Sequence, residues 1–248
     1  MGTIAGFGMS TILLPIAVIF MDFKTALVLV AITHLSGSLG AATFFRQGLD
    51  KRLLLLFGAP SVILTILGAY IVIYVPQNIL TIILGIFLLL FSIYSLRHPD
   101  FKINAGKLNN IIGGSLSGFL QGLMGIGGPL RGYFLISCDL DKTTYIATLA
   151  VIAILIDVTR IPIYLTTNLL GAQFYYLIPP LLVIGVLGSY TGKKIVNRIP
   201  QSTFKKNRSG GHRPGQLTVD LQWYSLSYLI CADSKVKIQP DGILKDGI

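Results

Sequence analysis

The sequence contains no glutamate, and its ten acidic residues are all aspartates, against 20 lysines and arginines. Charged residues make up 12% of the 248 residues, about half the share found in ordinary soluble domains. So few charges cannot cover the surface of a soluble domain of this size, and a soluble globular protein is excluded. The scarcity of negative charge is compatible with a path built for anions.

Cysteine is also scarce. The chain has two cysteines, Cys138 and Cys231, which have neither metal-ligand spacing nor a disulfide framework, and the sequence predicts no metal or cofactor. The first residues lack a basic region, so no cleavable signal peptide is expected. The net charge of +10 does not indicate a nucleic-acid partner, because lysine and arginine accumulate in the cytoplasmic loops of membrane proteins.

Apolar residues are abundant: 53% of the chain is hydrophobic, and the mean hydropathy is +0.74. A helix needs roughly 20 apolar residues to span a bilayer. Stretches near or above that length run over residues 25–45, 53–75, 79–96, 111–136, 143–165 and 172–190, and residues 2–21 form a shorter one. Strand-like alternation is absent. The sequence therefore predicts an all-α polytopic membrane protein in contact with the lipid bilayer.

The segment 118–137 lies within one of these stretches but is rich in helix-breaking residues. Glycine costs a helix interior about 1 kcal/mol and proline about 3 kcal/mol relative to alanine. The breaking residues are Gly122, Gly125, Gly127, Gly128, Pro129 and Gly132. We expect an interrupted or re-entrant segment here rather than one regular helix.

An internal repeat relates this segment to the start of the chain. When residues 6–27 are placed over residues 125–146, the pairs are Gly8 with Gly127, Asp22 with Asp141, and Thr25 with Thr144. The register continues, with small slips, to the prolines at 60 and 180. We expect a first membrane repeat over 1–106, a second over 107–206 whose last helix is missing or altered, and a polar tail over 207–248. This tail and the short N-terminus suggest a truncated or non-native reading.

Basic linkers indicate how the two repeats are oriented. They lie at 45–52, 97–107 and 193–198. If each repeat has one re-entrant segment and then crosses three times, the repeats are inverted and all three linkers fall on one side, as the positive-inside rule requires. We therefore expect inverted repeats, each with a glycine-broken or re-entrant segment plus about three transmembrane helices, in the cytoplasmic (inner) membrane.

Paired broken segments in two repeats indicate a transporter's binding site, and the N-termini of half-helices favour anions. The predicted substrate-binding residues are Gly6, Gly8, Ser10, Gly125, Gly127, Gly128, Pro129 and Arg131. Close helix packing is the alternative role for the glycines, and Arg131 could instead extend to the membrane surface. His34, Asp157 and Arg160 are candidates for ion coupling. For Asp157 and Arg160 a structural ion pair is the favoured interpretation, and His34 fits either packing or a substrate or proton site.

The motifs "GLMGIGGP" (122–129) and "IAGFGMSTILLP" (4–15) resemble the sulfite exporter TauE/SafE family of membrane permeases, over residues 2–206. The first copy departs from the family pattern at Met9 and Ser10, where the family tends to have glycine. The resemblance implies a non-enzymatic permease for sulfite, organosulfonates or related sulfur compounds. The expected partners are the small anion and a coupling proton or other ion, whose identity the sequence does not give. A non-transporting membrane scaffold or assembly subunit, or a membrane-embedded enzyme, are the alternatives.

Overall fold

The computed structural model describes residues 9–44, 48–97, 106–138 and 140–198. These ranges contain helices and turns but no strand. The α-helices are α2 (Met9–Phe20), α3 (Phe23–Phe44), α4 (Lys51–Leu53), α5 (Ala59–Tyr74), α6 (Gln77–Arg97), α7 (Lys107–Met124), α8 (Gly128–Ile136), α9 (Lys142–Thr166) and α10 (Ile178–Arg198). A π-helical turn, η1 (Leu54–Gly58), joins α4 to α5, and a 3-10 helix, η2 (Ala172–Leu177), precedes α10.

Among the described residues, four helical segments are long and apolar enough to cross a bilayer. They are Phe23–Phe44, Lys51–Tyr74, Lys142–Thr166 and Ala172–Lys194. Two shorter apolar helices cover Ser10–Phe20 and Gln77–Phe91. Large apolar side chains project from the outer faces of these helices, among them Leu55, Tyr74, Ile82, Leu89, Val183 and Leu187. The expected all-helical membrane architecture is confirmed.

The long segment Lys51–Tyr74 contains a π-helical turn because of Pro60. Proline has no N–H to donate to the carbonyl four residues earlier. The hydrogen-bond ladder shifts at this point, and the N–H of Ala59 donates to the carbonyl of Leu54, five residues back. The helix absorbs the proline without breaking.

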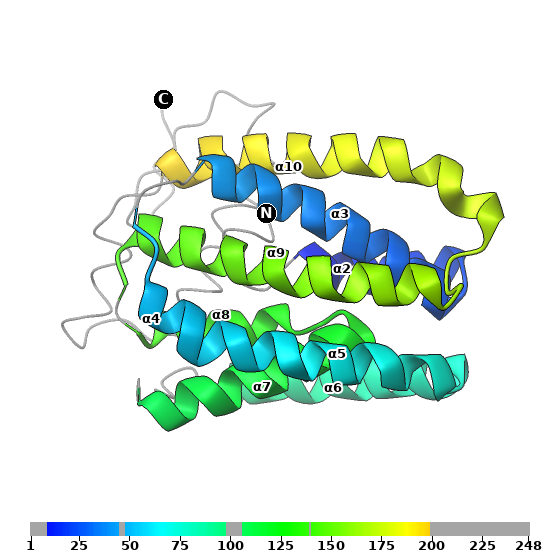
Figure 1. The fold of residues 1–248 in the computed structure, drawn as a ribbon, viewed down its shortest axis with the longest axis horizontal. Helices are drawn as coiled ribbons and strands as arrows, with labels where there is room; N and C mark the ends of the chain where they lie inside the picture. The colour runs from blue at the N-terminus through cyan, green and yellow to red at the C-terminus, as the bar shows by residue number, and fades with distance from the viewer. Residues whose placement is uncertain (1–8, 45–47, 98–105, 139, 199–248) are drawn as a thin grey trace, which may run out of the picture.

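The long helices lie side by side in one row. In Figure 1 the row runs α10, α3, α9 and α5 from top to bottom, with α7 and α6 below. The colours show that α3 and α9 run in opposite directions, as do α5 and α10 (Figure 1). The chain therefore alternates between two ends of the bundle.

The predicted interruption in residues 111–136 is confirmed, because this stretch forms two helices that make a hairpin. Near the open end, the Sγ of Cys138 lies 3.5 Å from the Oδ1 of Asn110. Near the closed end, the Oγ of Ser117 donates to the carbonyl of Gly127 at 2.8 Å. Helix α8 thus returns along α7 toward the end of the bundle at which α7 began.

Glycines on one face of α7 bring it against α5. A Cβ added at Gly118 would lie 2.0 Å from the carbonyl oxygen of Ser61, and one at Gly122 would lie 2.3 Å from that of Thr65. The hydroxyls of Ser61 and Thr65 donate across the contact to the carbonyls of Gly114 and Gly118, at 2.8 and 3.0 Å. These glycines serve close helix packing, as small residues do in membrane helices.

A second contact of this kind joins α3 to α10. A Cβ added at Gly40 would lie 2.7 Å from the Cβ of Ser189, and one at Gly185 would meet the hydroxyl of Ser36. The hydroxyl of Ser189 donates to the carbonyl of Gly37. The small residues Ser36, Gly37 and Gly40 thus form the face of α3 that packs against α10.

Aspartates begin both α3 and α9. The Oδ2 of Asp22 accepts from the N–H of Thr25 at 2.9 Å, and the Oδ2 of Asp141 accepts from the N–H of Thr144 at 3.2 Å. Each aspartate satisfies an N–H of the first helical turn. Desolvation opposes ionisation of Asp141, but hydrogen bonds from Thr143 and Thr144 outweigh it and lower the pKa of this carboxyl.

Candidate functional site

A buried carboxylate, Asp157, joins the two central helices near their midpoints. Its Oδ2 lies 2.6 Å from the Nδ1 of His34 on α3, and its Oδ1 accepts from the Nε of Arg160 at 2.9 Å on its own helix, α9. Asp157 and Arg160 are fully buried, and His34 is buried as well. The predicted ion pair between Asp157 and Arg160 is confirmed, and His34 is its third member.

The same cluster reaches the broken hairpin. The Nη1 of Arg160 donates to the backbone carbonyl of Gln121 at 2.8 Å, and the hydroxyl of Tyr164 donates to the carbonyl of Gly122. The carbonyl of Gln121 also accepts from the N–H of Gly125 at 3.0 Å, whereas the carbonyl of Gly122 lies in the last turn of α7, where no helical N–H follows to donate to it. Side chains of α9 therefore satisfy the end of α7 and fix it beside the charges.

The break itself begins at Gly125, which has a left-handed backbone with φ of 71°. An L residue with a side chain rarely adopts this conformation, so glycine is favoured here. A Cβ added at Gly125 would lie 2.9 Å from a methyl carbon of Leu27 and 3.5 Å from the Nη1 of Arg160. The turn between α7 and α8 is thus enclosed by α3 and α9, close to the guanidinium of Arg160.

Several polar atoms near the break are buried and have no hydrogen-bond partner. They are the Oγ of Ser10, both side-chain atoms of Gln121, the Nη1 of Arg131 and the Nη2 of Arg160. The Nη2 of Arg160 lies 2.8 Å from the Oδ1 of Asp157. The carboxylate therefore balances its positive charge, although the geometry is not that of a hydrogen bond. A buried polar group without a partner costs about 1–3 kcal/mol. The other atoms have no compensation of this kind.

The charges of the cluster do not balance. Arg131 is 3% exposed, and the charged groups that act on it are Asp157 and Arg160. Among the described residues, Asp157 pairs with His34 and Arg160 but not with Arg131, so the guanidinium of Arg131, which stays protonated, has no paired carboxylate. With His34 neutral, the described groups carry one excess positive charge. Unpaired buried charges are rare because they are costly.

The predicted binding residues fall into three groups. Gly6 and Gly8 lie outside the described residues. Ser10 and Arg131 are buried and carry unpartnered polar atoms, so Arg131 does not extend to the surface. Gly125, Gly127, Gly128 and Pro129 form the turn and the first residues of α8, which begins without a side-chain cap.

Gly127 has a packing constraint that its sequence context did not reveal. A Cβ at this position would lie 2.1 Å from the carbonyl oxygen of Ser117 and 2.8 Å from the Cβ of Gln121. A side chain here would push α8 away from α7. Any effect of Gly127→Val on binding would therefore be mixed with a structural one.

Sequence reasoning missed Gln121 and Tyr164. Gln121 is fully buried one helical turn before the break, with both its backbone carbonyl and its side-chain amide in the cluster region. An amide in an otherwise apolar and glycine-rich stretch was the available signal. Tyr164 gave none, because a tyrosine near the end of a membrane helix is common. No group of three potential metal ligands occurs among the described residues.

Apolar helices long enough to span a bilayer, arranged around a buried charged cluster, define an integral membrane protein of the polytopic helical class. The chain belongs to the sulfite exporter TauE/SafE family, a family of membrane transporters, whose model matches residues 1–207. Neither a curated protein nor a solved structure matches the chain. The resemblance seen in the glycine motifs is thereby confirmed.

Proposed function

We propose that the chain is a secondary transporter that moves small anions, such as sulfite, organosulfonates or related sulfur compounds, across the cytoplasmic membrane. The observation that carries this proposal is the excess positive charge of the buried cluster at the broken hairpin. A bound anion would neutralise it. The family membership supports a transported substrate, and the charge supports an anionic one.

The binding site that we propose lies between α8, α2 and the end of α7. The Nη1 of Arg131, the amide of Gln121 and the hydroxyl of Ser10 are polar atoms that an anion could satisfy. The N-terminus of α8 adds the positive end of a helix dipole and N–H groups that have no acceptor within the helix. Ser10 lies one turn from Leu14 on α2, and Leu14 lies beside Gly125.

Inverted repeats are part of this proposal. The register that pairs Gly8 with Gly127 also pairs the first residues of α2 and α8, Met9 and Gly128, and the first residues of α3 and α9, Phe23 and Lys142. Helix α5 packs on α9, as α10 packs on α3. The corresponding helices run in opposite directions, α3 against α9 and α5 against α10, which supports an inverted rather than a parallel relation (Figure 1).

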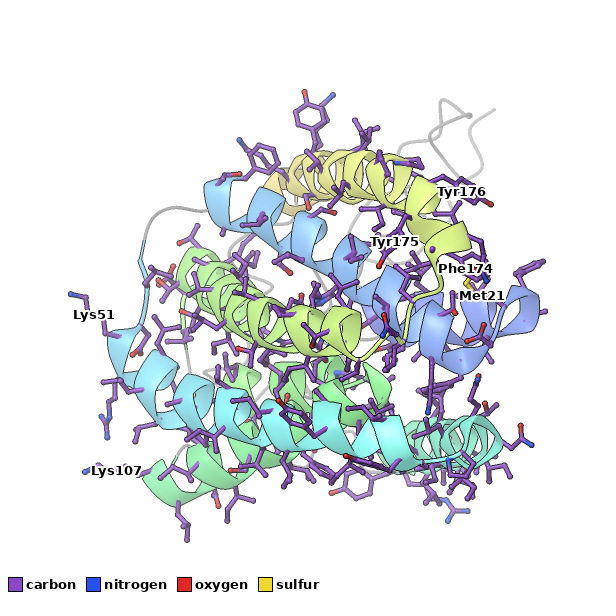
Figure 2. All side chains as sticks on the ribbon, turned by 45° about the vertical axis from the view of Figure 1, so that its right-hand side comes forward. Met21, Lys51, Lys107, Phe174, Tyr175 and Tyr176 are labelled. Atoms are coloured by element: carbon purple, nitrogen blue, oxygen red, sulfur yellow. The ribbon has the colours of Figure 1, made fainter. Side chains whose placement is uncertain are left out.

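The two ends of the bundle differ in composition. Lys51 and Lys107 project at one end, and Met21, Phe174, Tyr175 and Tyr176 lie at the other (Figure 2). Lys193 belongs to the first end as well, since its Nζ lies over the ring of Phe44 at the end of α3. We propose that this basic end faces the cytoplasm and that the hairpin of α7 and α8 enters from it.

Single-cysteine labelling tests this orientation. In a background with both cysteines changed to serine, Lys51→Cys and Lys107→Cys should react with an impermeant maleimide only after the cells are permeabilised. Tyr176→Cys, at an exposed residue of the opposite end, should react in intact cells. Reaction of Lys107→Cys in intact cells would contradict the inverted, re-entrant arrangement.

The alternatives account for less of the structure. A scaffold subunit would explain the packing glycines of α7, but not an uncompensated charge beside a broken helix. A membrane-embedded enzyme would need a set of acid, base, nucleophile or metal ligands, and the described cluster offers one carboxylate and one histidine, both engaged with each other.

Flux measurements test the transport function. Purified protein in sealed vesicles should take up radiolabelled sulfite faster than protein-free vesicles, and unlabelled sulfite should compete more effectively than acetate. Sulfite offers three oxygens to the donors of the site, and acetate offers two. Uptake equal to that of protein-free vesicles for sulfite and organosulfonates would refute the proposed function.

Arg131→Gln should weaken anion affinity by about tenfold or more, because a charge-assisted hydrogen bond contributes about 1.5–3 kcal/mol. The measurement is the concentration of sulfite that gives half-maximal uptake. Arg131→Lys should lose less, since it keeps the charge. Arg52→Gln, at an exposed cation of the basic end, is the matched control and should keep the affinity. Unchanged affinity in Arg131→Gln would remove this residue from the site.

A further inference from the structure

His34 is the member of the buried cluster whose charge can change most readily. The guanidinium groups of Arg131 and Arg160 remain protonated, whereas an imidazole commonly gains or loses its proton between about pH 5 and pH 8. To donate to the ionised carboxylate of Asp157, Nδ1 must carry the ring proton. Nε2 makes no bond with any described group, so it can accept a second proton without disturbing the contact with Asp157.

The surroundings of His34 contain few other groups that could respond to pH. Helices α2, α6, α9 and α10 pack against α3. On α9, Asp157 contacts the imidazole of His34, and Arg160 pairs with the other oxygen of that carboxylate. The charge of Arg131 on α8 also acts on Asp157. Helix α2 has no titratable residue. Helix α6 meets the start of α3 through Gln77, far from its own Tyr94 and Arg97. The titratable residues of α10 are Tyr190, Lys193, Lys194 and Arg198. Tyr190 and Lys193 lie beside the ring of Phe44 at the last residue of α3, and His34 lies in the middle of that helix.

His34 is linked to the break through bonded groups. Asp157 joins it to Arg160, and Arg160 donates to the carbonyl of Gln121 at the end of α7. These contacts connect α3 from the first half of the chain and α9 from the second half to the hairpin of α7 and α8, at which the proposed binding site lies. A change in the charge of His34 therefore acts directly on the groups that position this site.

We infer that His34 takes up one proton at Nε2 when the anion binds and releases it when the anion leaves, so that the transporter moves its anion together with a proton. This inference rests on the proposed function. The proton comes from water on the side from which the anion enters and returns to water on the other side. An O–H bond of a hydronium ion breaks as the N–H bond at Nε2 forms, the reverse happens on release, and no electron is transferred.

The reason is electrostatic reciprocity. With His34 neutral, the cluster has one excess positive charge, which a monovalent anion neutralises. A protonated His34 adds a second positive charge, which is costly in the empty site and favourable beside a bound anion. If the proton favours the anion, the anion favours the proton by the same factor.

The test uses vesicles in which only the lumenal pH is varied. The external pH stays at about 6, so external sulfite has the same protonation throughout, and the lumenal pH is set to about 6 or about 8. The membrane potential is clamped at zero. Initial uptake by the wild-type protein should rise about fivefold or more with the alkaline lumen, the lower end of typical coupling between linked sites.

In His34→Gln, which keeps an amide donor for Asp157 but cannot take up a proton, the two rates should be equal. Ser38→Ala, one turn further along the same helix and buried, is the control and should keep the wild-type ratio. A ratio that persists in His34→Gln, or equal rates in the wild type, would overturn the inference and leave the transport function standing. Wild-type uptake no faster than in protein-free vesicles would refute the transport function itself.

If His34→Gln yields no folded protein, a pH-sensitive dye in the lumen of wild-type vesicles replaces it. At an external pH of about 8, where sulfite is mostly a dianion, the lumen should acidify as sulfite enters. Sulfite entry without acidification would overturn proton coupling.

Discussion

Gly118→Leu should abolish most of the folded protein. The residue faces α5 at a point where even a Cβ would lie 2.0 Å from the backbone of Ser61. A larger side chain must separate α5 from α7, and overpacking of this kind costs about 1–3 kcal/mol or occasionally more. The separation also breaks the interhelical bonds from Ser61 and Thr65, at about 0.6 kcal/mol each.

The yield of monodisperse protein in detergent and its melting temperature measure this effect. Gly85→Leu on α6 is the matched control, because a Cβ at Gly85 meets nothing within 4 Å. It should express and melt like the wild type. A Gly118→Leu protein with wild-type stability would mean that α5 and α7 do not approach as closely as described.

The sequence was sufficient to predict where the chain breaks. The density of glycine around Pro129 cannot be reconciled with one regular helix, and the helices indeed end and begin at Met124 and Gly128. It did not predict the direction in which α8 leaves the break. That depends on contacts between residues far apart in the segment, such as Asn110 with Cys138, and no local propensity encodes them.

The glycines illustrate a second limit of sequence reasoning. Binding and packing roles require the same residue, since both need backbone to approach closely. The structure distinguishes the two roles by the atoms that lie next to each glycine. Gly118 and Gly122 lie against α5, and Gly127 lies against Ser117, so these three glycines serve packing. Gly125 differs, because its left-handed backbone and its position beside Arg160 fit the turn at the centre of the candidate site.

The ionisable residues were predictable as a set but not in their connections. Asp157 and Arg160 are three positions apart, so their pairing follows from helix geometry. The contact with His34 does not, because it depends on how α3 packs against α9. The burial of Arg131 likewise follows from the return of α8 into the bundle, which adds a third charged or titratable group, after His34 and Arg160, that acts on the carboxylate.

Asp157→Asn should reduce the amount of folded protein strongly. The carboxylate is the sole described anion among Arg131, Arg160 and His34, and removing one partner of a buried ion pair costs about 3–5 kcal/mol. Yield and melting temperature in detergent measure the effect. The double variant Asp157→Asn with Arg160→Gln should be more stable than Asp157→Asn alone, because it removes the cation that the single change leaves uncompensated.

Asp141→Asn is the control for this substitution. Asp141 is an exposed helix cap, and asparagine caps a helix about as well as aspartate, so the melting temperature should stay close to that of the wild type. Asp157→Asn at full yield and unchanged melting temperature, but without sulfite uptake, would contradict the structural role. It would place Asp157 directly on the path of the anion or the proton, since a stable protein that cannot transport has lost a functional group and not a structural one.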